Sequence, residues 1–400
     1  MDLSAKKVAV IGAGIGGLAV ARALALRGAQ VTVLEQAPEI REVGAGLQIS
    51  PNGMAVLRGL GLSDALRATG AVAAQAVSLR NACGTEVLRL DLARHAAGLE
   101  YYCVHRADLI GVLAEGARAA GARLRLLHKV DRIQPGDMPE VVTGNGARVR
   151  ADLVIGADGL HSRLRPVLNG AGRAAFTRQV AWRAVLGAEE DPTPEVRVYM
   201  GPHRHVVSYP LRGGTLRNLV AVEEVRTWTD EGWSHQGDPR ALARVFSDFG
   251  PEVQRLLDRV TEVHRWGLFR HPVARNWTGE GTALLGDAAH PTLPFLAQGA
   301  NMALEDAWVL SDALDRAGDL ASGLAAYAAA RRGRTVRIID AASRNAWKYH
   351  LSFPPLRAAG HMVLRLGGRI APAAMVRQFD WIYRHDVTGG AVLADGAGPA

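Results

Sequence analysis

Short, continuous apolar segments recur along the chain, and each one runs into a loop marked by glycine. Lys7–Ile11, Asp152–Ile155 and Thr282–Leu285 are segments of this kind. Apolar, β-branched segments of this length are typical of strands that are buried on both faces of a parallel sheet. The pattern therefore predicts an α/β fold whose parallel strands come from widely separated parts of the chain.

The first segment opens a complete strand–helix–strand unit. GAGIGG follows it at Gly12–Gly17, a helical pattern covers Leu18–Arg27 and ends at Gly28, and a second strand is predicted at Gln30–Leu34. Glycine is common just beyond the end of a helix. This order and spacing are those of a βαβ unit that binds a dinucleotide.

Four residues of this unit have a physical reason to contact such a ligand. Gly12 permits the tight turn, Gly14 lets the backbone approach a pyrophosphate, and Gly17 lets the helix pack against the strand. Glu35 ends the second strand, where a carboxylate accepts hydrogen bonds from ribose hydroxyls. The unit alone does not separate NAD from FAD, and a glycine-rich turn without a ligand is the alternative.

Two further loops follow the other apolar segments. GADG lies at Gly156–Gly159 and GDAAHP at Gly286–Pro291, and Ala297–Asn301 then opens a helix predicted over residues 302–314. The Asp287 carboxylate, just past a strand end, suits ribityl hydroxyls, and the positive end of the helix suits an electron-rich group. Each loop, taken alone, can equally be an ordinary strand-to-helix turn.

The middle of the chain shows the period-two alternation of antiparallel strands. A strand is predicted at Leu124–Ile133, and Glu140–Arg150 is predicted to be a hairpin that turns at Asn145-Gly146. Arg204–Tyr209 and Leu216–Glu223 alternate on either side of Gly213-Gly214, which predicts part of a larger sheet. We expect this sheet to form a substrate lobe.

Two polar side chains of that sheet are expected to face the same way. His205 and Tyr209 are four residues apart on one strand, so their side chains lie on one face, whereas His203 faces the other. A histidine on the open face of such a sheet is a candidate general base. The alternative for His205 is a histidine that is hydrogen-bonded within the sheet.

The C-terminal part is predicted to be helical and is strongly basic. A helical pattern covers Ala330–Tyr383 and is broken at Pro354-Pro355. Arg331–Arg384 contains eleven Arg or Lys residues and two acidic ones. Its net charge of +9 (11 − 2) exceeds the net charge of +8 of the whole chain. Such a lobe can attract nucleic acid, anionic lipid or a phosphorylated cofactor. A solvated helical face or a subunit contact is the alternative.

Composition places the chain among globular enzymes. It is 48% apolar and 22% charged, which is ordinary for such proteins. We expect no signal peptide and no membrane span, because no long uncharged apolar segment occurs. The two cysteines, Cys83 and Cys103, form neither a disulfide framework nor a metal set. A reducing cytoplasm is therefore expected.

The three loops taken together resemble those of the group A FAD-dependent aromatic monooxygenases. The stretches Val33–Leu57, His105–Leu109 (HRADL) and Asp380–Asp386 (DWIYRHD) also resemble this family. The similarity lies closest to the branch of salicylate hydroxylase, 6-hydroxynicotinate 3-monooxygenase and 3-hydroxybenzoate 6-hydroxylase. It extends over nearly all of residues 5–386.

The resemblance implies a fold and a division of the chain. The expected fold is a Rossmann-type, glutathione-reductase-like FAD-binding domain with an inserted, mostly antiparallel substrate sheet and a helical C-terminal region. The FAD-binding domain would comprise residues 1–72, 104–172 and 270–330, and the sheet lobe residues 73–103 and 173–269. The helical region would cover residues 331–386, with a flexible tail at 387–400.

The resemblance also implies roles for individual residues. The expected FAD contacts are Gly12, Gly14, Gly17, Glu35, Gly46, Leu47, Arg106, Val130, Asp158, Asp287, Gly299, Ala300 and Asn301. The expected catalytic residues are His205, Tyr209 and Pro291, and the expected pocket residues are Arg183, Pro294 and Phe295. Arg41 is either a cofactor contact or a surface arginine. Pro294 and Phe295 replace a polar amide and a histidine of the relatives, which predicts a less polar end to the pocket.

The implied reaction is the hydroxylation of a small aromatic, phenolic or hydroxylated carboxylic acid substrate. NADH or NADPH would bind transiently and reduce FAD, O2 would add at the flavin C4a position, and the resulting hydroperoxide would transfer one oxygen. No metal is required for this reaction. No nucleic acid partner is expected, whereas a homodimer is a predicted assembly. The alternatives are a non-benzenoid ring, such as that of a polyketide or antibiotic, and a flavin-binding redox partner without turnover.

Overall fold

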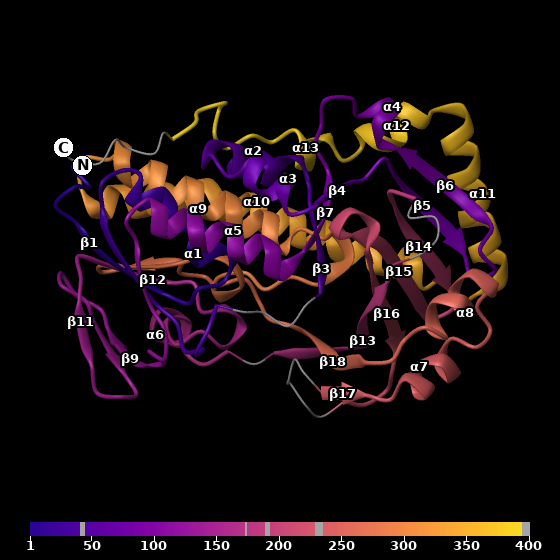
Figure 1. Ribbon diagram of the computed structural model, residues 1–400, viewed down its shortest axis with the longest axis horizontal. Helices are drawn as coiled ribbons and strands as arrows, with labels where there is room; N and C mark the ends of the chain where they lie inside the picture. The colour runs from indigo at the N-terminus through magenta and orange to yellow at the C-terminus, as the bar shows by residue number, and fades with distance from the viewer. Residues whose placement is uncertain (41–44, 173, 189–192, 229–234, 394–400) are drawn as a thin grey trace.

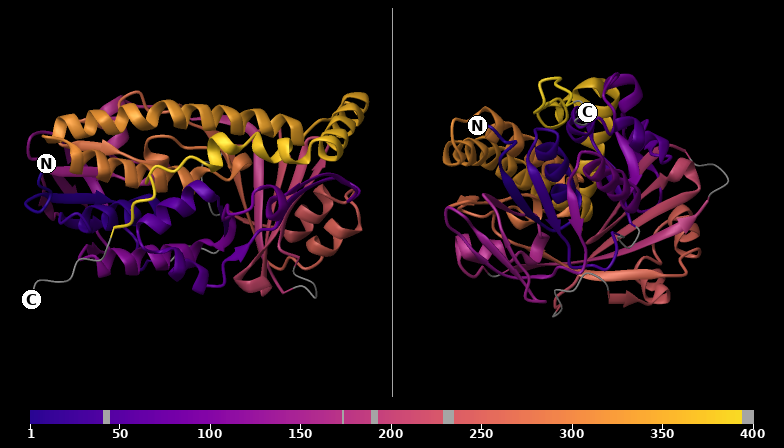
Figure 2. Two further views of the ribbon diagram at one scale, coloured as in Figure 1. Left: turned by 90° about the horizontal axis from the view of Figure 1, so that it is seen from above. Right: turned by 60° about the vertical axis from the view of Figure 1, so that its left-hand side comes forward.

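Two β-sheets lie at opposite ends of the molecule, and long helices run along one side of both (Figure 1). The computed structural model describes residues 1–40, 45–172, 174–188, 193–228 and 235–393. Figure 2 shows that helix α10 (Leu320–Tyr349) extends from the first sheet to the second. The chain passes several times between the two ends, so each sheet is built from separated segments.

The first sheet is the predicted parallel sheet. Its strands are ordered β19-β20-β12-β1-β2-β8. Their bounds are Thr278–Gly279, Thr282–Leu284, Leu153–Gly156, Lys7–Ile11, Gln30–Leu34 and Arg123–Arg125, in the same order. All neighbours pair in parallel except the short edge strand β19. The three predicted apolar strands thus lie side by side in the centre, as their hydrophobicity requires.

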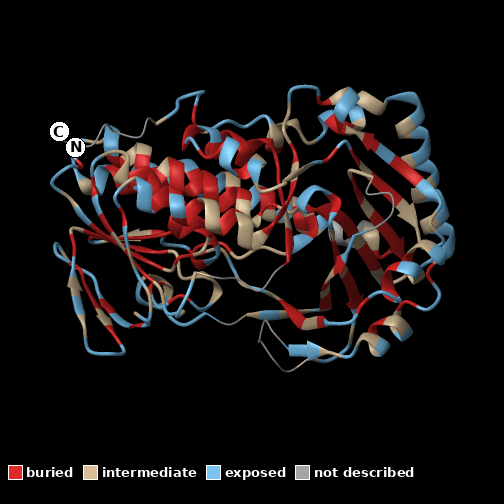
Figure 3. Cartoon of the chain, in the orientation of Figure 1, coloured by how far each residue is buried: buried red, intermediate tan, exposed pale blue. Residues whose placement is uncertain are grey.

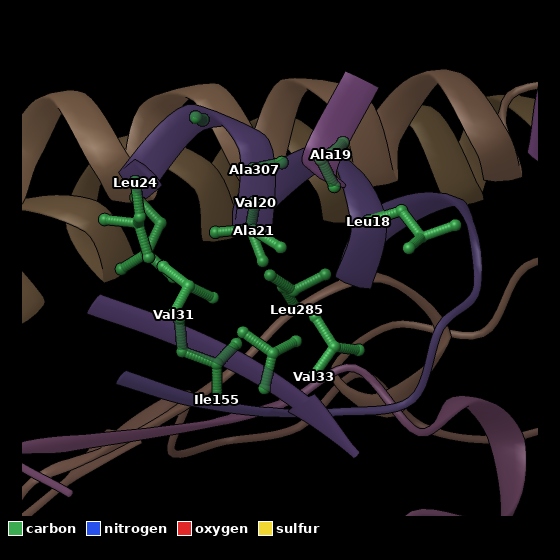
Figure 4. Packing of buried hydrophobic residues seen from close by; sticks show 14 of the residues in the cluster. Leu18, Ala19, Val20, Ala21, Leu24, Val31, Val33, Ile155, Leu285 and Ala307 are labelled. Atoms are coloured by element: carbon green, nitrogen blue, oxygen red, sulfur yellow. The ribbon is translucent and has the colours of Figure 1, made fainter. Parts of the chain in front are cut away.

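Three helices pack on one face of this sheet and bury its apolar side chains. They are α1 (Ile15–Ala25), α5 (Arg106–Ala119) and α9 (Gly299–Arg316). Figure 4 shows the contact between α1 and the strands, and Figure 3 shows that the buried positions concentrate there. Helix α9 begins at Gly299 rather than at the predicted Met302. The helix is therefore already formed where the third loop meets it.

One predicted strand is wrong. The pattern at Leu124–Ile133 predicts a single strand, but the chain forms β8, which ends at Arg125, and β9 (Val130–Gln134). The break has a physical cause, since Leu127 has a φ of 59°, which turns the chain. Strand β9 pairs instead with the predicted hairpin, β10 (Glu140–Thr143) and β11 (Arg148–Arg150), in a separate three-stranded sheet.

The second sheet has eight strands in the order β17-β18-β13-β16-β15-β14-β5-β6. Their bounds are His235–Gly237, Val263–Arg270, Ala175–Gly187, Leu216–Glu224, Arg204–Leu211, Glu195–Gly201, Ala76–Asn81 and Glu86–Asp91, in the same order. All pairs are antiparallel except β5 with β14. The predicted mostly antiparallel sheet is confirmed.

Alternation along β15 divides its side chains between two environments. Val206 packs with α7 (Pro239–Val245) and α8 (Pro251–Leu257), which cover one face of the sheet. His205 and Tyr209 lie on the other face, where the sheet borders a cavity. The predicted common direction of these two side chains is thus confirmed.

The remaining elements connect the two sheets or cover the second one. A small sheet, β3-β7-β4, is formed by Gly46–Ile49, Tyr102–His105 and Val72–Ala73. The short helices α2, α3, α4 and α6 cover Pro51–Gly59, Ser63–Ala68, Leu92–His95 and Leu164–Asn169. After α10 the chain forms α11, α12 and α13 at Pro354–Ile370, Pro372–Arg377 and Asp380–Tyr383. Among the described residues, no helix is both long and apolar enough to span a membrane.

Candidate active site

A cavity of about 470 Å³ lies between the first and second sheets. Residues from all three glycine-marked loops line one end, and the second sheet lines the other. Thirteen of the residues expected at the site line it: Gly14, Gly46, Leu47, Arg106, Arg183, His205, Tyr209, Asp287, Pro291, Pro294, Phe295, Gly299 and Ala300. Segments almost 300 residues apart in the sequence therefore meet around one space.

The three glycines of the first loop have different surroundings. Gly12 has a φ of 97°, and a Cβ there would lie 2.6 Å from the Ala157 carbonyl oxygen. A Cβ on Gly17 would lie 2.0 Å from the carbonyl oxygen of Gly12. A Cβ on Gly14, in contrast, would meet no atom within 4 Å. Gly12 and Gly17 permit the loop to pack, whereas Gly14 leaves open space at the start of α1.

Gly14→Val is expected to weaken FAD binding by at least about tenfold without unfolding the protein. The added side chain enters the open space by the N-terminus of α1, where no side chain caps the helix N–H groups. FAD affinity is measured by fluorescence titration, and folding by circular dichroism. Gly17→Ala is the comparison, because its clash within the loop should lower thermal stability directly. Unchanged FAD affinity in Gly14→Val would contradict the assignment.

Glu35 holds the first loop in place. Its Oε2 accepts a hydrogen bond from the backbone N–H of Ala13 at 2.7 Å, and its Oε1 accepts one from Ala37 at 2.9 Å. The carboxylate does not line the cavity. Glu35 therefore fixes the turn through the backbone, and each oxygen retains a lone pair for a further donor.

The third loop brings a carboxylate and a helix N-terminus to the cavity. Helix α9 begins at Gly299 without a side-chain cap and without an acidic residue in its first turn, so its dipole favours an electron-rich group. Asp287 lines the cavity, and desolvation by the surrounding protein raises the pKa of its carboxyl. The positive charge of Arg106, which lines the same cavity, opposes this shift.

These features fit FAD. The open space at Gly14 and the α1 N-terminus suit a pyrophosphate. The carboxylate of Asp287 suits ribityl hydroxyls, and the N-terminus of α9 suits the electron-rich side of a flavin ring. Among the described residues, no group of His, Cys, Asp and Glu side chains could hold a metal ion. The open space at Gly14, the Asp287 carboxylate and the two helix N-termini are the features that suit a dinucleotide.

The other expected FAD residues do not line the cavity. Val130 is buried in the apolar core. Asp158 accepts a hydrogen bond from the backbone N–H of Arg163 at 2.7 Å through Oδ2, which closes the second loop. Asn301 joins α9 to strand β3, because its Nδ2 donates to the Gln48 carbonyl at 3.1 Å. Arg41 lies outside the described residues.

The opposite end of the cavity combines polar and apolar side chains of the second sheet. Arg183 lies over the ring of Trp266, with 4.5 Å between its guanidinium carbon and the ring centroid. The rings of His205 and Phe295 are 5.8 Å apart. Burial, with the neighbouring His350, lowers the pKa of His205 well below its ordinary value. The imidazole is therefore neutral at neutral pH and able to accept a proton.

Tyr209 lies where the second sheet meets strand β3. A Cβ on Gly46 would lie 2.6 Å from the Tyr209 ring, so only glycine fits there. The backbone N–H of Gly46 donates to Asn218 Oδ1 at 2.7 Å. Burial raises the pKa of the Tyr209 hydroxyl, which therefore stays protonated. These contacts tie the sheet to strand β3.

The roof of the cavity rests on buried ion pairs. Pro291 lines the cavity, and the preceding His290 stacks on Trp277 with ring centroids 5.0 Å apart. His290 Nε2 also contacts the carboxylate of Asp306 on α9. Asp306 in turn accepts a hydrogen bond from Arg331 Nε at 2.7 Å. The loop that contains His290 and Pro291 is therefore anchored to α9 through Asp306, which in turn is bound to α10 through Arg331.

Several residues that line the cavity were not among those predicted for the site, although Gln48 and Tyr383 lie within stretches that resemble the family. They include Gln48, Tyr101, Trp266, Tyr349, Leu364, Met375, Phe379 and Tyr383. Five of them come from the C-terminal helices α10 to α13 or, in the case of Phe379, from the short connection between α12 and α13. Apolar periodicity in that region predicts a helix but not which surface the helix covers.

Comparison with known proteins agrees with this geometry. A family model described as FAD binding domain matches residues 5–342. The chain is 38% identical over 363 residues to 3-amino-4-hydroxybenzoate 2-monooxygenase of Streptomyces cremeus, which covers 87% of this chain and 89% of that protein. It is 34% identical over 391 residues to 3-hydroxybenzoate 6-hydroxylase 1 of Aquipseudomonas alcaligenes, covering 94% and 97%.

A solved structure extends the similarity to three dimensions. Klebsiella pneumoniae HpxO complexed with FAD and uric acid has a TM-score of 0.80 at 25% identity, and the match covers 93% of this chain and 96% of that one. The predicted family and the predicted cofactor FAD are confirmed. The chain therefore belongs to the FAD binding domain family, and it is an FAD-dependent monooxygenase.

Proposed function

We propose that this enzyme hydroxylates a small phenolic ring that carries a carboxylate, with FAD, NADH or NADPH, and O2. The observation that supports this substrate class is that the guanidinium of Arg183 and the imidazole of His205 line the cavity on a face of the second sheet that is otherwise largely apolar. Arg183 pairs with Val220, and Val220 pairs with Val207, two residues from His205, so both polar side chains project from the same face. Strand β13, which carries Arg183, and strand β15, which carries His205, are separated by β16. Two strand spacings correspond to about 10 Å.

The names of the relatives support the same class. The protein from Streptomyces cremeus is named for 3-amino-4-hydroxybenzoate, and that from Aquipseudomonas alcaligenes for 3-hydroxybenzoate. Both compounds have a ring hydroxyl and a carboxylate. In this chain, Arg183 would bind the carboxylate and His205 would face the hydroxyl.

In the proposed reaction, the residues of the protein bind the substrate, orient it and exclude water from it. When bound, FAD accepts electrons from the nicotinamide nucleotide and activates O2. His205 would take the proton of the ring hydroxyl, which makes the ring more nucleophilic. Tyr209, which stays protonated, would donate a hydrogen bond to the substrate. Pro291 and Phe295 line the cavity and would exclude water from it.

Arg183→Met is expected to raise KM for carboxylated phenols by about tenfold or more and to leave KM for neutral phenols unchanged. Methionine retains the contact with Trp266 but loses the charge, and a hydrogen bond to a charged group contributes about 1.5–3 kcal/mol. Steady-state kinetics on both substrate types measures the difference. Arg178→Met, an exposed position on the same strand, is the control. An equal KM change for both types would argue against carboxylate recognition.

One experiment tests the proposed function directly. FAD-loaded protein is mixed with NADH or NADPH and with 3-amino-4-hydroxybenzoate, 3-hydroxybenzoate, 6-hydroxynicotinate or a neutral phenol. Nucleotide oxidation, product mass and hydrogen peroxide are measured together. A product heavier by one oxygen, with little peroxide, supports the proposal. Stimulated oxidation that yields only peroxide marks a compound that fits the pocket but is not the substrate. No stimulation by any ring favours the flavin-binding redox partner.

A larger ring system is the second candidate substrate. The cavity extends along the second sheet to Leu364, Met375 and Phe379 of the C-terminal region, all of them apolar. A polyketide-sized or other non-benzenoid ring would contact this extension, whereas a benzoate would not reach it. Including a polycyclic phenol in the same assay separates the two candidates.

We further propose the division into an FAD-binding domain, a sheet lobe and a helical region at the boundaries predicted above. Cytoplasmic location is proposed because NADH and NADPH are supplied there, and because Cys83 and Cys103 are both free. A homodimer stays a prediction.

A further inference from the structure

A chain of hydrogen bonds leads from His205, at the cavity, toward the surface. His205 Nδ1 lies 2.6 Å from His350 Nε2, and His350 Nδ1 lies 2.8 Å from Glu224 Oε1. His205 and His350 are buried, whereas the side chain of Glu224 is 37% exposed. The three groups come from strand β15, the turn after α10, and the end of strand β16.

Electrostatics fixes the direction of these hydrogen bonds. Burial opposes ionisation of Glu224, but hydrogen bonds from His203 and His350 outweigh it and lower the pKa of the carboxyl. The ionised carboxylate only accepts, so His350 Nδ1 carries the proton and His350 Nε2 must accept from His205 Nδ1. Burial lowers the pKa of His350, which keeps its imidazole neutral. His205 Nε2 is then unprotonated, and it makes no hydrogen bond to a described residue.

The backbone holds the chain of groups in place. The N–H of His203 donates to the His350 carbonyl at 3.2 Å, and the N–H of Glu224 donates to the His203 carbonyl at 3.0 Å. His203 Nδ1 also lies 2.7 Å from Glu224 Oε2, the oxygen that His350 does not use. The turn after α10 is thereby anchored to the edge where β15 begins and β16 ends. His203 anchors the carboxylate, but it lies outside the path from the cavity.

We propose that His205, His350 and Glu224 form a proton relay that carries the proton of the substrate hydroxyl out of the cavity to solvent. The inference rests on the proposed function, in which His205 accepts that proton. The substrate O–H bond breaks and its proton binds His205 Nε2, while the proton on His205 Nδ1 moves to His350 Nε2. The proton on His350 Nδ1 moves to Glu224, which releases it to water. The reverse transfer returns a proton to the product oxygen and restores both imidazoles.

The test uses FAD-loaded protein and 4-nitrophenol, a phenol whose phenolate is coloured. Stopped-flow absorbance follows phenolate formation on binding, at a pH where free 4-nitrophenol is mostly protonated. Glu224→Gln keeps an oxygen that accepts from His350 but cannot take up a proton. This variant is expected to form phenolate at least about tenfold more slowly, with unchanged FAD content. Glu262→Gln makes the same change at an exposed carboxylate outside the relay, and it is expected to stay within about twofold of wild type.

The outcomes separate the relay from the proposed function. Wild-type rates in both Glu224→Gln and His350→Asn would overturn the relay, even if hydroxylation continues. Absence of phenolate in the wild-type complex would overturn it as well. Phenolate formation that depends on Glu224, without hydroxylation of any ring, would refute the proposed function and leave the relay standing. If the variants do not fold, nitrogen-15 NMR of wild-type histidines decides, because a proton on His205 Nε2 instead of Nδ1 excludes the relay.

Discussion

Replacing His205 by asparagine is expected to lower the rate of hydroxylation by about 10²- to 10³-fold and to leave FAD binding unchanged. His205 lines the substrate end of the cavity, and asparagine there cannot accept a proton. The predicted FAD contacts come from the three loops at the other end of the cavity, so the substitution should not disturb them. Product formation by chromatography and FAD content by absorbance measure the two properties on the same sample.

Two comparisons make this prediction sharp. His203→Gln removes a histidine two residues away that faces solvent, with 57% of its side chain exposed, and it should hydroxylate normally. Because the pKa of His205 is well below its ordinary value, the wild-type imidazole stays neutral as pH falls through 6.5. Activity is therefore expected to persist into mildly acidic solution. Hydroxylation by His205→Asn within about threefold of wild type would contradict the role of a base.

The geometry of the glycine-marked end of the site was predictable because its signals are local. Gly12, Gly14 and Gly17 lie within six residues of one another, and the adjacent strand and helix are read from the same segment. Their backbone conformation and close approaches follow from the missing Cβ. The sequence also predicts that His205 and Tyr209 share a face, since strand periodicity requires it.

His350 was not predictable by the same reasoning. It is 145 residues from His205 in the chain, and its position depends on how a 30-residue helix packs across both sheets. No periodicity on either segment specifies that contact. A single histidine beyond the end of a helix has the same appearance in sequence whether it is buried or solvated.

The basic C-terminal segment shows a third situation, in which the signal was present but incomplete. The basic pattern that includes Arg331 and Arg334 predicts a solvated helical face, a subunit contact or a surface for an anionic partner. Arg331 is instead 1% exposed, and both arginines bind the buried Glu305 of α9. Glu305 and its neighbour Asp306 interrupt an apolar stretch of α9. Carboxylates buried at such positions require cationic partners. Only the structure supplies those cations.

Arg331→Met is accordingly expected to lower the free energy of unfolding by about 3–5 kcal/mol, because it removes the buried cation that the carboxylates of Glu305 and Asp306 share. Arg331 donates to Asp306 from Nε at 2.7 Å and contacts Glu305 through Nη1. Urea denaturation of the FAD-loaded protein, followed by circular dichroism, measures the change. Arg332→Met, at the next and exposed position, should stay within about 0.5 kcal/mol of wild type.

The dependence of stability on pH provides an independent test of the same ion pairs. Burial alone would raise the pKa of Asp306, but the interactions of its carboxylate with His290 and Arg331 outweigh burial and lower the pKa to about 2. A lowered carboxyl pKa stabilises the folded state above the unfolded value of 3.8 and loses this effect as pH falls toward 2. Arg331→Met removes one of these charges, so its acid unfolding should begin at higher pH than that of wild type. Acid unfolding at the same pH, with unchanged urea stability, would mean that Arg331 contributes packing and not charge, since methionine fills the same apolar space.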